Sequence, residues 1–405
     1  MAVLATGGSR PVSGSWWSGR RRTSAWYAAF AVHAGAVAVF SGPGQDRIWG
    51  LWAVGGYAVA ALLVARWRAH GGIGALGISL LGALIAPVVW LDMTAPPTPD
   101  VQVVARAAAL VLHHGTPYLP TAQLTTVIAY NPYLPVMSVF GLPSAIGLSG
   151  VLGDPRLWLA AATFALLTAA FRIAGRQDAV RVAVFAVASS VLAFPLALGI
   201  TDPPMLALLC LTAALLSRGR LWPAAIALGV ACAMKATAWP ALPVFAAMLA
   251  TRDSGRVALR FTAGTAAIAA GLLAACAPAA LRHPSSLVQN TVLFPLGLTH
   301  AKTPAASPLP GHLLASTGSA GHLAAIGVLA VAGLALAVSL VTRPPTDGPA
   351  AIRRLAIGLT VLFALAPATR FGYFAYPIGL FGWLVLYQPH SPIAPETRET
   401  SDGPP

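Results

Sequence analysis

The sequence predicts an all-α polytopic integral membrane protein, and three observations support this prediction. Of its 405 residues, 57% are hydrophobic and only 9% are charged, whereas a soluble domain has roughly 25% charged residues. The apolar residues fall in runs close to the length of a membrane-spanning helix, about 20 residues. The arginines behind the net charge of +14 lie in short clusters between these runs, as the positive-inside rule expects. The charge therefore indicates membrane topology and argues against a nucleic-acid partner.

Basic clusters orient the predicted helices. Arg20–Arg22 and the pair Arg66 and Arg68 mark the cytoplasmic side. Residues 1–24 then form a cytoplasmic N-terminal segment, and a single transmembrane domain covers 25–388. This domain has about twelve crossings. The predicted crossings are residues 25–41, 49–65, 73–91, 157–171, 180–198, 203–217, 221–237, 239–251, 257–279, 319–342, 354–368 and 371–388.

The remaining segments are predicted to lie at the membrane boundary. Residues 136–150 are apolar but short, and a crossing there would place the arginines of 172–181 outside. We therefore expect this segment to dip into the outer leaflet and return. The order of the other runs leaves a first outer loop at 92–135 and a second at 280–318. The polar tail 389–405 is expected to be cytoplasmic and disordered.

The first outer loop contains a predicted surface helix over Pro99 to His114. Asp100 lies in its first turn, where the helix dipole favours a carboxylate. Gly115 follows at the expected stop, and Pro117 enforces it. Asp100 is either an ordinary N-terminal charge or a general base that takes a proton from an attacking hydroxyl. Asp92, at the end of a predicted crossing, is the alternative base.

Lys235 is the deepest ionisable residue that the sequence shows. It lies in ALGVACAMKATAWPALP, and no acidic partner inside a crossing is apparent. An ionisable residue within a span indicates a functional site, although a lysine near an interface also reaches water by snorkelling. The functional interpretation is a phosphate ligand. Asp202, before two prolines in GITDPPML, either caps the next helix or lines the site and orients Lys235.

Other polar groups face the same side. Arg370, in PATRFGYFAYP, breaks the positive-inside pattern, and a lipid phosphate or a carboxylate partner would explain it. Tyr373 and Tyr376 are first interpreted as aromatic residues of the membrane interface. His114 either is a solvated surface histidine or contacts a phosphate. The sequence has no D-x-D, H-x-x-x-H or paired-cysteine pattern, so no metal is expected.

Four motifs together resemble a known group of membrane enzymes. They are DVQVVARAAALVLHHGTPY from Asp100, YNPYLPVMSVFGLP from Tyr130, the stretch from GITDPPML to MKATAWPALP, and TRFGYFAYP near the C-terminus. In order and spacing they resemble the GT-C superfamily of glycosyltransferases, and most closely glycosyltransferase family 87, the polyprenol-phosphate-mannose-dependent mannosyltransferases. Val103 and Val104 stand where that family often has a tyrosine.

The resemblance implies a GT-C-like fold with a large extracytoplasmic first loop that carries the surface helix and the catalytic base. The base of the family corresponds to Asp100. The activity implied is inverting transfer of a sugar, expected to be mannose, from a polyprenyl-phosphate donor. The acceptor would be a hydroxyl of a cell-envelope glycolipid or lipid-linked glycan at the outer face of the cell membrane.

In this scheme Lys235, Arg370 and His114 bind the donor phosphate, whose charge grows in the transition state. Tyr118, Tyr130, Asp202 and Tyr373 line the substrate pocket, and neither a metal nor another cofactor is needed. Two alternatives from other classes stay open: a transporter or flippase of lipid-linked sugars, and a non-catalytic membrane protein. A transporter would be expected to have a relay of ionisable residues through several spans. The sequence shows one such deep residue, Lys235, which argues against this alternative.

Overall fold

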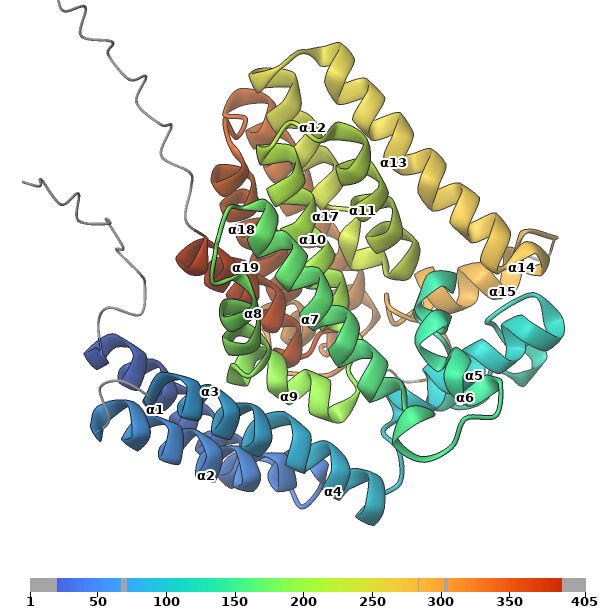
Figure 1. Cartoon of the computed structure of the whole chain (residues 1–405). Coiled ribbons are helices and arrows are strands. Elements are labelled where there is room, and N and C mark those ends of the chain that lie inside the picture. Colours follow the sequence, from blue (N-terminus) through green and yellow to red (C-terminus); the bar gives the residue numbers. More distant parts are fainter. Residues whose placement is uncertain (1–19, 67–70, 283, 302–304, 388–405) are drawn as a thin grey trace, which may run out of the picture.

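The computed structural model describes residues 20–66, 71–282, 284–301 and 305–387. In these ranges the chain is all-helical, apart from one isolated parallel bridge between Ala306 and Thr369. Figure 1 shows a tilted bundle whose short helices α5, α6, α14 and α15 gather at one end. The predicted all-α fold is confirmed. The predicted tail 389–405 and most of the predicted N-terminal segment lie outside the described residues.

The length of the helices supports a membrane protein. Among the described residues, seven helices are long and apolar enough to cross a membrane, and the pair α8 and α9, bent by 63°, would make an eighth. Four more apolar helices have only 10–17 residues. The expected count of about twelve crossings is therefore not confirmed, although the polytopic class is.

The N-terminal helices form a layer of their own at the lower left of Figure 1. They are α1 (Arg20–Phe40), α2 (Gln45–Arg66), α3 (Gly71–Leu80), the π-helical turn η2 (Leu81–Ile85) and α4 (Ala86–Thr94). Gly56 of α2 faces Gly82, because an added Cβ on Gly56 would lie 2.9 Å from the Gly82 Cα. Small residues allow this close backbone approach in membranes. The Trp49 indole N–H donates to the Ala83 carbonyl at 2.8 Å, which fixes the π-helical turn.

Helix α5 spans Pro99–His114, the bounds that the sequence predicts. The Thr98 hydroxyl accepts a hydrogen bond from the Val101 amide at the N-terminus, and Gly115 ends the helix with a φ of 66°. One face of α5 is buried. Segment 136–150 forms η5 (Pro135–Gly141), α6 (Leu142–Ala145) and the start of η6 (Gly150–Leu152). Of these, η5 and α6 pack against α5. At this contact an added Cβ on Gly141 would lie 2.4 Å from the Val104 carbonyl oxygen.

The central helices include α10, which packs mainly against α7 and α11. They are α7 (Pro155–Ile173), α8 (Ala179–Val187), α9 (Ser190–Leu198), α10 (Asp202–Ser217), α11 (Leu221–Met234), η7 (Ala236–Ala238) and α12 (Ala241–Arg252). Helix α10 is buried along almost its whole length, as expected of a helix that is apolar on every side. It carries Asp202 at its first position into the interior of the bundle.

The C-terminal part follows, and its last two helices pack on α10. It consists of α13 (Gly255–Cys276), α14 (Pro278–Arg282), α15 (Pro284–Val288), η8 (Gln289–Leu293), α16 (Pro310–Ala315), α17 (Ser319–Thr342), α18 (Gly348–Leu365), η9 (Phe371–Phe374) and α19 (Ala375–Leu386). The predicted outer loop 280–318 is thus largely short helices. Helix α17 is the most exposed span, with 6% of its apolar window buried.

Gly199 positions α5 against the start of α10. Its φ is 75°, and an added Cβ would lie 2.2 Å from Val101 Cγ2. The Thr98 hydroxyl also donates to the Leu198 carbonyl at 2.8 Å. This contact holds the first turn of α5, with Asp100, beside the residues that lead into Asp202.

We expect Gly199→Ala to lower the thermal denaturation midpoint in detergent, because alanine disfavours this φ by roughly 1–3 kcal/mol and because its Cβ would overlap Val101. The control is Gly77→Ala in α3, where an added Cβ meets nothing within 4 Å. An unchanged midpoint in Gly199→Ala would contradict the packing described for α5.

Candidate functional site

A buried ion pair lies where α10 begins and α11 ends. The Lys235 ammonium group bonds to the Asp202 carboxylate. Their side chains are only 13% and 6% exposed. The Tyr376 hydroxyl, at the start of α19, donates to the same carboxylate oxygen at 2.5 Å. Three separate segments therefore converge on one carboxylate.

Local sequence explains why these groups meet. Pro203 and Pro204 occupy the first turn of α10, where missing amide protons cost nothing, so the helix starts at Asp202. Helix α11 stops at Lys235, which adopts an extended backbone with φ −155° and ψ 139°. This break frees the Met234 carbonyl, which accepts a hydrogen bond from the Leu134 amide at 2.9 Å. The first outer loop is thereby attached to the end of α11.

Tyr133 connects the ion pair to Asp100. Its hydroxyl donates to the Asp100 carboxylate, and its ring centroid lies 5.4 Å from the Lys235 Nζ. The Lys235 Nζ also lies 6.0 Å from the centre of the Tyr376 ring, so two aromatic faces stabilise the cation. Burial, followed by the nearby Asp100 charge, raises the pKa of Tyr133 well above its ordinary value. The phenol therefore stays protonated and acts as a donor to Asp100.

Arg370 and Tyr373 complete the cluster from the loop before α19. Both are half-buried. Tyr373 lies within electrostatic range of Lys235, Arg370, Asp202 and Asp100. The preceding residue, Thr369, is fully buried, and its amide donates to the Ala305 carbonyl at 2.9 Å. The second outer loop thus fixes the backbone that presents Arg370.

Asp92, the alternative base, belongs to a different cluster. Its carboxylate lies 3.2 Å from Arg156 Nη2, and Asp154 lies 2.5 Å from the same nitrogen. Arg156 is 4% exposed and is the second residue of α7. This triad joins the end of α4 to the start of α7, which gives Asp92 a structural partner that Asp100 does not share.

His114 and Tyr130 are not brought to the ion pair. His114 is exposed at the last position of α5, about 21 Å along the helix axis from Asp100 at 1.5 Å per residue. Tyr130 stacks on Phe294 with ring centroids 4.4 Å apart and an interplanar angle of 8°, which joins the two outer loops. Tyr118 has a supporting position, because its buried hydroxyl donates to the Tyr133 carbonyl at 3.0 Å.

Sequence reasoning missed two tyrosines. Tyr376 is 1% exposed and bonded to Asp202, so its interpretation as a residue of the membrane interface was wrong. The structure pairs Asp202, at the start of α10, with Lys235, which is one of the two interpretations that the sequence left open for Asp202. Tyr133 was passed over in favour of Tyr130. Its position next to proline in YNPYLP does not reveal the direction of its side chain.

The described residues contain no group of three or more His, Cys, Asp or Glu side chains that could hold a metal ion. Among them, the cysteines are free thiols, with Cys210 and Cys232 buried. The expectation that the reaction needs no metal therefore stays a prediction. The charged groups present can bind an anion through Lys235 and Arg370 and can accept a proton at Asp100.

Fold and site together define a polytopic membrane protein with a mixed-charge cluster at the end of its helical bundle that carries the short loop helices. The family model of glycosyltransferase family 87 matches residues 132–367, which is more than half of the chain. The chain belongs to glycosyltransferase family 87 and is a membrane glycosyltransferase. No curated protein and no solved structure matches it. The matched range includes Tyr133, Asp202 and Lys235 and ends before Arg370.

We expect Lys235→Met and Asp202→Asn each to destabilise the protein strongly. Removing one member of a buried ion pair leaves an uncompensated charge or unpaired donors, at a cost of roughly 3–5 kcal/mol. The double variant Lys235→Met/Asp202→Asn should recover part of this loss, because it leaves no unpaired charge. Thermal denaturation of the four proteins measures the coupling, and strictly additive effects would contradict a direct pair.

Proposed function

We propose that this glycosyltransferase moves a sugar, with mannose as the expected one, from a polyprenyl-phosphate donor to a hydroxyl of a cell-envelope glycolipid or lipid-linked glycan. The observation that carries the proposal is the placement of Asp100 beside Tyr133, within electrostatic range of Lys235. A proton acceptor and a phosphate-binding cation thus lie in one cluster at the membrane boundary. No cofactor and no nucleic acid takes part in this scheme.

Asp100 acts as the general base in a single displacement. The acceptor oxygen attacks the anomeric carbon of the sugar, the bond from that carbon to the phosphate oxygen breaks, and its electron pair leaves with the phosphate. The acceptor proton passes to Asp100. One displacement inverts the configuration at the anomeric carbon. The Tyr133 hydroxyl holds the carboxylate in one orientation during the attack.

The charges of the cluster change in the direction that this step needs. Before reaction, the cluster contains two carboxylates, Asp100 and Asp202, and two cations, Lys235 and Arg370. When Asp100 takes the proton, the cluster gains positive charge just as the phosphate gains negative charge. Groups fixed in place beforehand stabilise such developing charge most effectively. Asp202 keeps the Lys235 ammonium in position and moderates its charge, so release of the lipid phosphate remains feasible.

A transporter of lipid-linked sugars is the competing function, since a buried lysine and aspartate also occur in proton-coupled transport. The pair lies at helix ends, next to a loop tyrosine that bonds to Asp100. A relay would need ionisable groups that continue through several spans. Below the pair, α10 has no acidic or basic residue. Its two hydroxyls, on Thr212 and Ser217, bond to the carbonyls of Leu208 and Ala213, each at 2.8 Å. These observations favour transfer over transport.

We expect Asp100→Asn to lower the rate of sugar transfer by about 10²–10⁴-fold, the usual contribution of a general base, while polyprenyl-phosphate binding is retained. The matched control is Asp92→Asn, which removes the other first-loop carboxylate and should keep transfer above half of wild type. The assay is transfer of radiolabelled mannose from polyprenyl-phosphate-mannose to envelope lipids. Loss of transfer in Asp92→Asn alone would reassign the base.

The proposal places the active site on the extracytoplasmic face of the cell membrane. Exposed His113 lies at the end of α5. Exposed Gln177 follows the last turn of α7, the end of that helix opposite to the one where Arg156 contacts Asp92. In a Cys276→Ser background, an impermeant maleimide on intact cells should label His113→Cys and should label Gln177→Cys only after lysis. The opposite pattern would place the cluster on the cytoplasmic face.

A further inference from the structure

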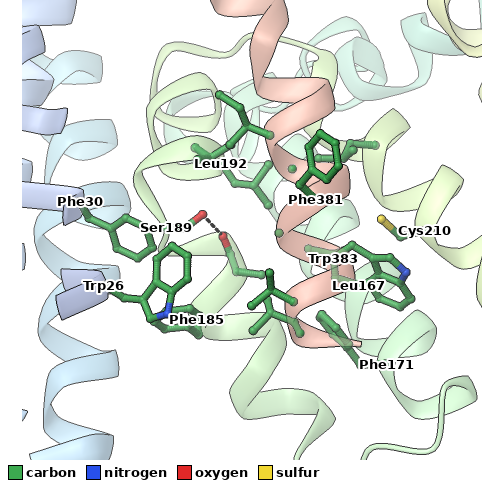
Figure 2. Close-up of a pocket in the computed structure, with 18 residues that line it drawn as sticks. Trp26, Phe30, Leu167, Phe171, Phe185, Ser189, Leu192, Cys210, Phe381 and Trp383 are labelled. Carbon is green, nitrogen blue, oxygen red and sulfur yellow. Dashed lines mark hydrogen bonds between the residues drawn. The ribbon is translucent and has the colours of Figure 1, made fainter. Parts of the chain in front are cut away.

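An apolar cavity of about 240 Å³ lies apart from the polar cluster, among α1, α7, the bend between α8 and α9, α10 and α19. Figure 2 shows Trp26 and Phe30 on one side of it and Phe381 and Trp383 of α19 across from them. Its one hydroxyl, on Ser189, donates to the Ala186 carbonyl at 2.6 Å. The walls therefore offer apolar contacts and no free hydroxyl, as a hydrocarbon ligand requires.

On the side nearer the polar cluster, the lining residues Leu206 and Gly379 are in close contact. An added Cβ on Gly379 would lie 2.4 Å from Leu206 Cδ2, so the leucine side chain packs directly on the backbone of α19. Leu206 follows Asp202 by one turn of α10, and Gly379 follows Tyr376 by one turn of α19. This contact stands between the ion pair and the rest of the cavity. A chain that comes from the site would have to pass it.

The cavity is open toward the lipid-facing surface between α1 and α19. Trp26 is 39% exposed, and Ile378, Phe381 and Val385 are 52%, 42% and 48% exposed. The residues behind them, such as Phe171 and Cys210, are 1% exposed. A flexible chain could therefore enter sideways from the membrane and reach buried walls.

Two arginines lie beside this opening. Arg22 precedes Trp26 by one turn of α1, and Arg181 precedes Phe185 by one turn of α8. Residues four apart share a face of a helix. Both arginines are exposed, and neither has an ion-pair partner within the described ranges. Both belong to the first turn of their helix, where the dipole also favours an anion.

We propose that the cavity binds one acyl chain of an anionic phospholipid, whose phosphate lies against Arg22 and Arg181. The apolar lining suits the chain, and the two exposed guanidinium groups suit the phosphate. The Leu206–Gly379 contact argues against the donor's prenyl chain as the occupant. Bound there, the lipid joins α1 to α19, which places it between the N-terminal layer and the central helices.

The test uses the full-length protein in detergent and native mass spectrometry with dioleoylphosphatidylglycerol, and with dioleoylphosphatidylcholine as the neutral probe. Gly382→Leu fills the cavity from α19, since an added Cβ on this lining residue meets nothing within 4 Å. It should remove one tightly bound phosphatidylglycerol. The control Gly333→Leu, on exposed α17 and equally open, should keep it.

Arg22→Gln/Arg181→Gln should weaken phosphatidylglycerol binding by about tenfold or more, as expected from removing two basic groups beside an anionic headgroup. Binding of phosphatidylcholine should not change, and Arg353→Gln, an exposed arginine of α18, should behave as wild type. The comparison of Arg22→Gln/Arg181→Gln with Arg353→Gln tests the proposal if Gly382→Leu does not fold. Equal phosphatidylglycerol binding by Arg22→Gln/Arg181→Gln and by Arg353→Gln would overturn the proposal. Displacement of the bound phospholipid by equimolar polyprenyl phosphate would overturn it as well.

Discussion

The buried bond between Lys235 and Asp202 is the interaction on which the rest of the site depends. A lone ammonium or carboxylate at membrane depth is costly, and this pair offsets that cost only with good geometry and further donors. Asp202 gains the Tyr376 hydroxyl at 2.5 Å, and Lys235 gains two aromatic faces. The starts of α10 and α19 and the end of α11 are therefore fixed relative to one another.

The first outer loop takes its place from this arrangement. The Met234 carbonyl, freed where α11 breaks at Lys235, accepts from the Leu134 amide at 2.9 Å, and the adjacent Tyr133 bonds to Asp100. From the other side, Gly199 and the Thr98 hydroxyl hold the first turn of α5. Buried contacts on both sides of this helix thereby fix its first turn. They hold the carboxylate of Asp100, the proposed base, beside Tyr133.

Short sequence patterns predicted helix bounds well, but they did not predict which distant segments contact one another. The bounds of α5 follow from Pro99, Asp100 and Gly115, which act within one turn, so the sequence predicted them correctly. The predicted membrane class likewise follows from composition. Tyr133 and Tyr376 meet Asp100 and Asp202 through packing of segments up to 174 residues apart in the chain, and no local pattern contains that information. The number of crossings was also not predictable from hydropathy, because breaks such as the one at Lys235 divide apolar runs into helices of 10–17 residues.

A structure of the protein with bound polyprenyl phosphate, determined by electron cryomicroscopy, would show whether the cluster binds the donor phosphate. We expect the phosphate to lie within hydrogen-bonding distance of Lys235 or Arg370, on the side of the cluster that faces Asp100. A phosphate bound instead at the far end of α5, next to His114, or within the cavity beside α1, would contradict this expectation.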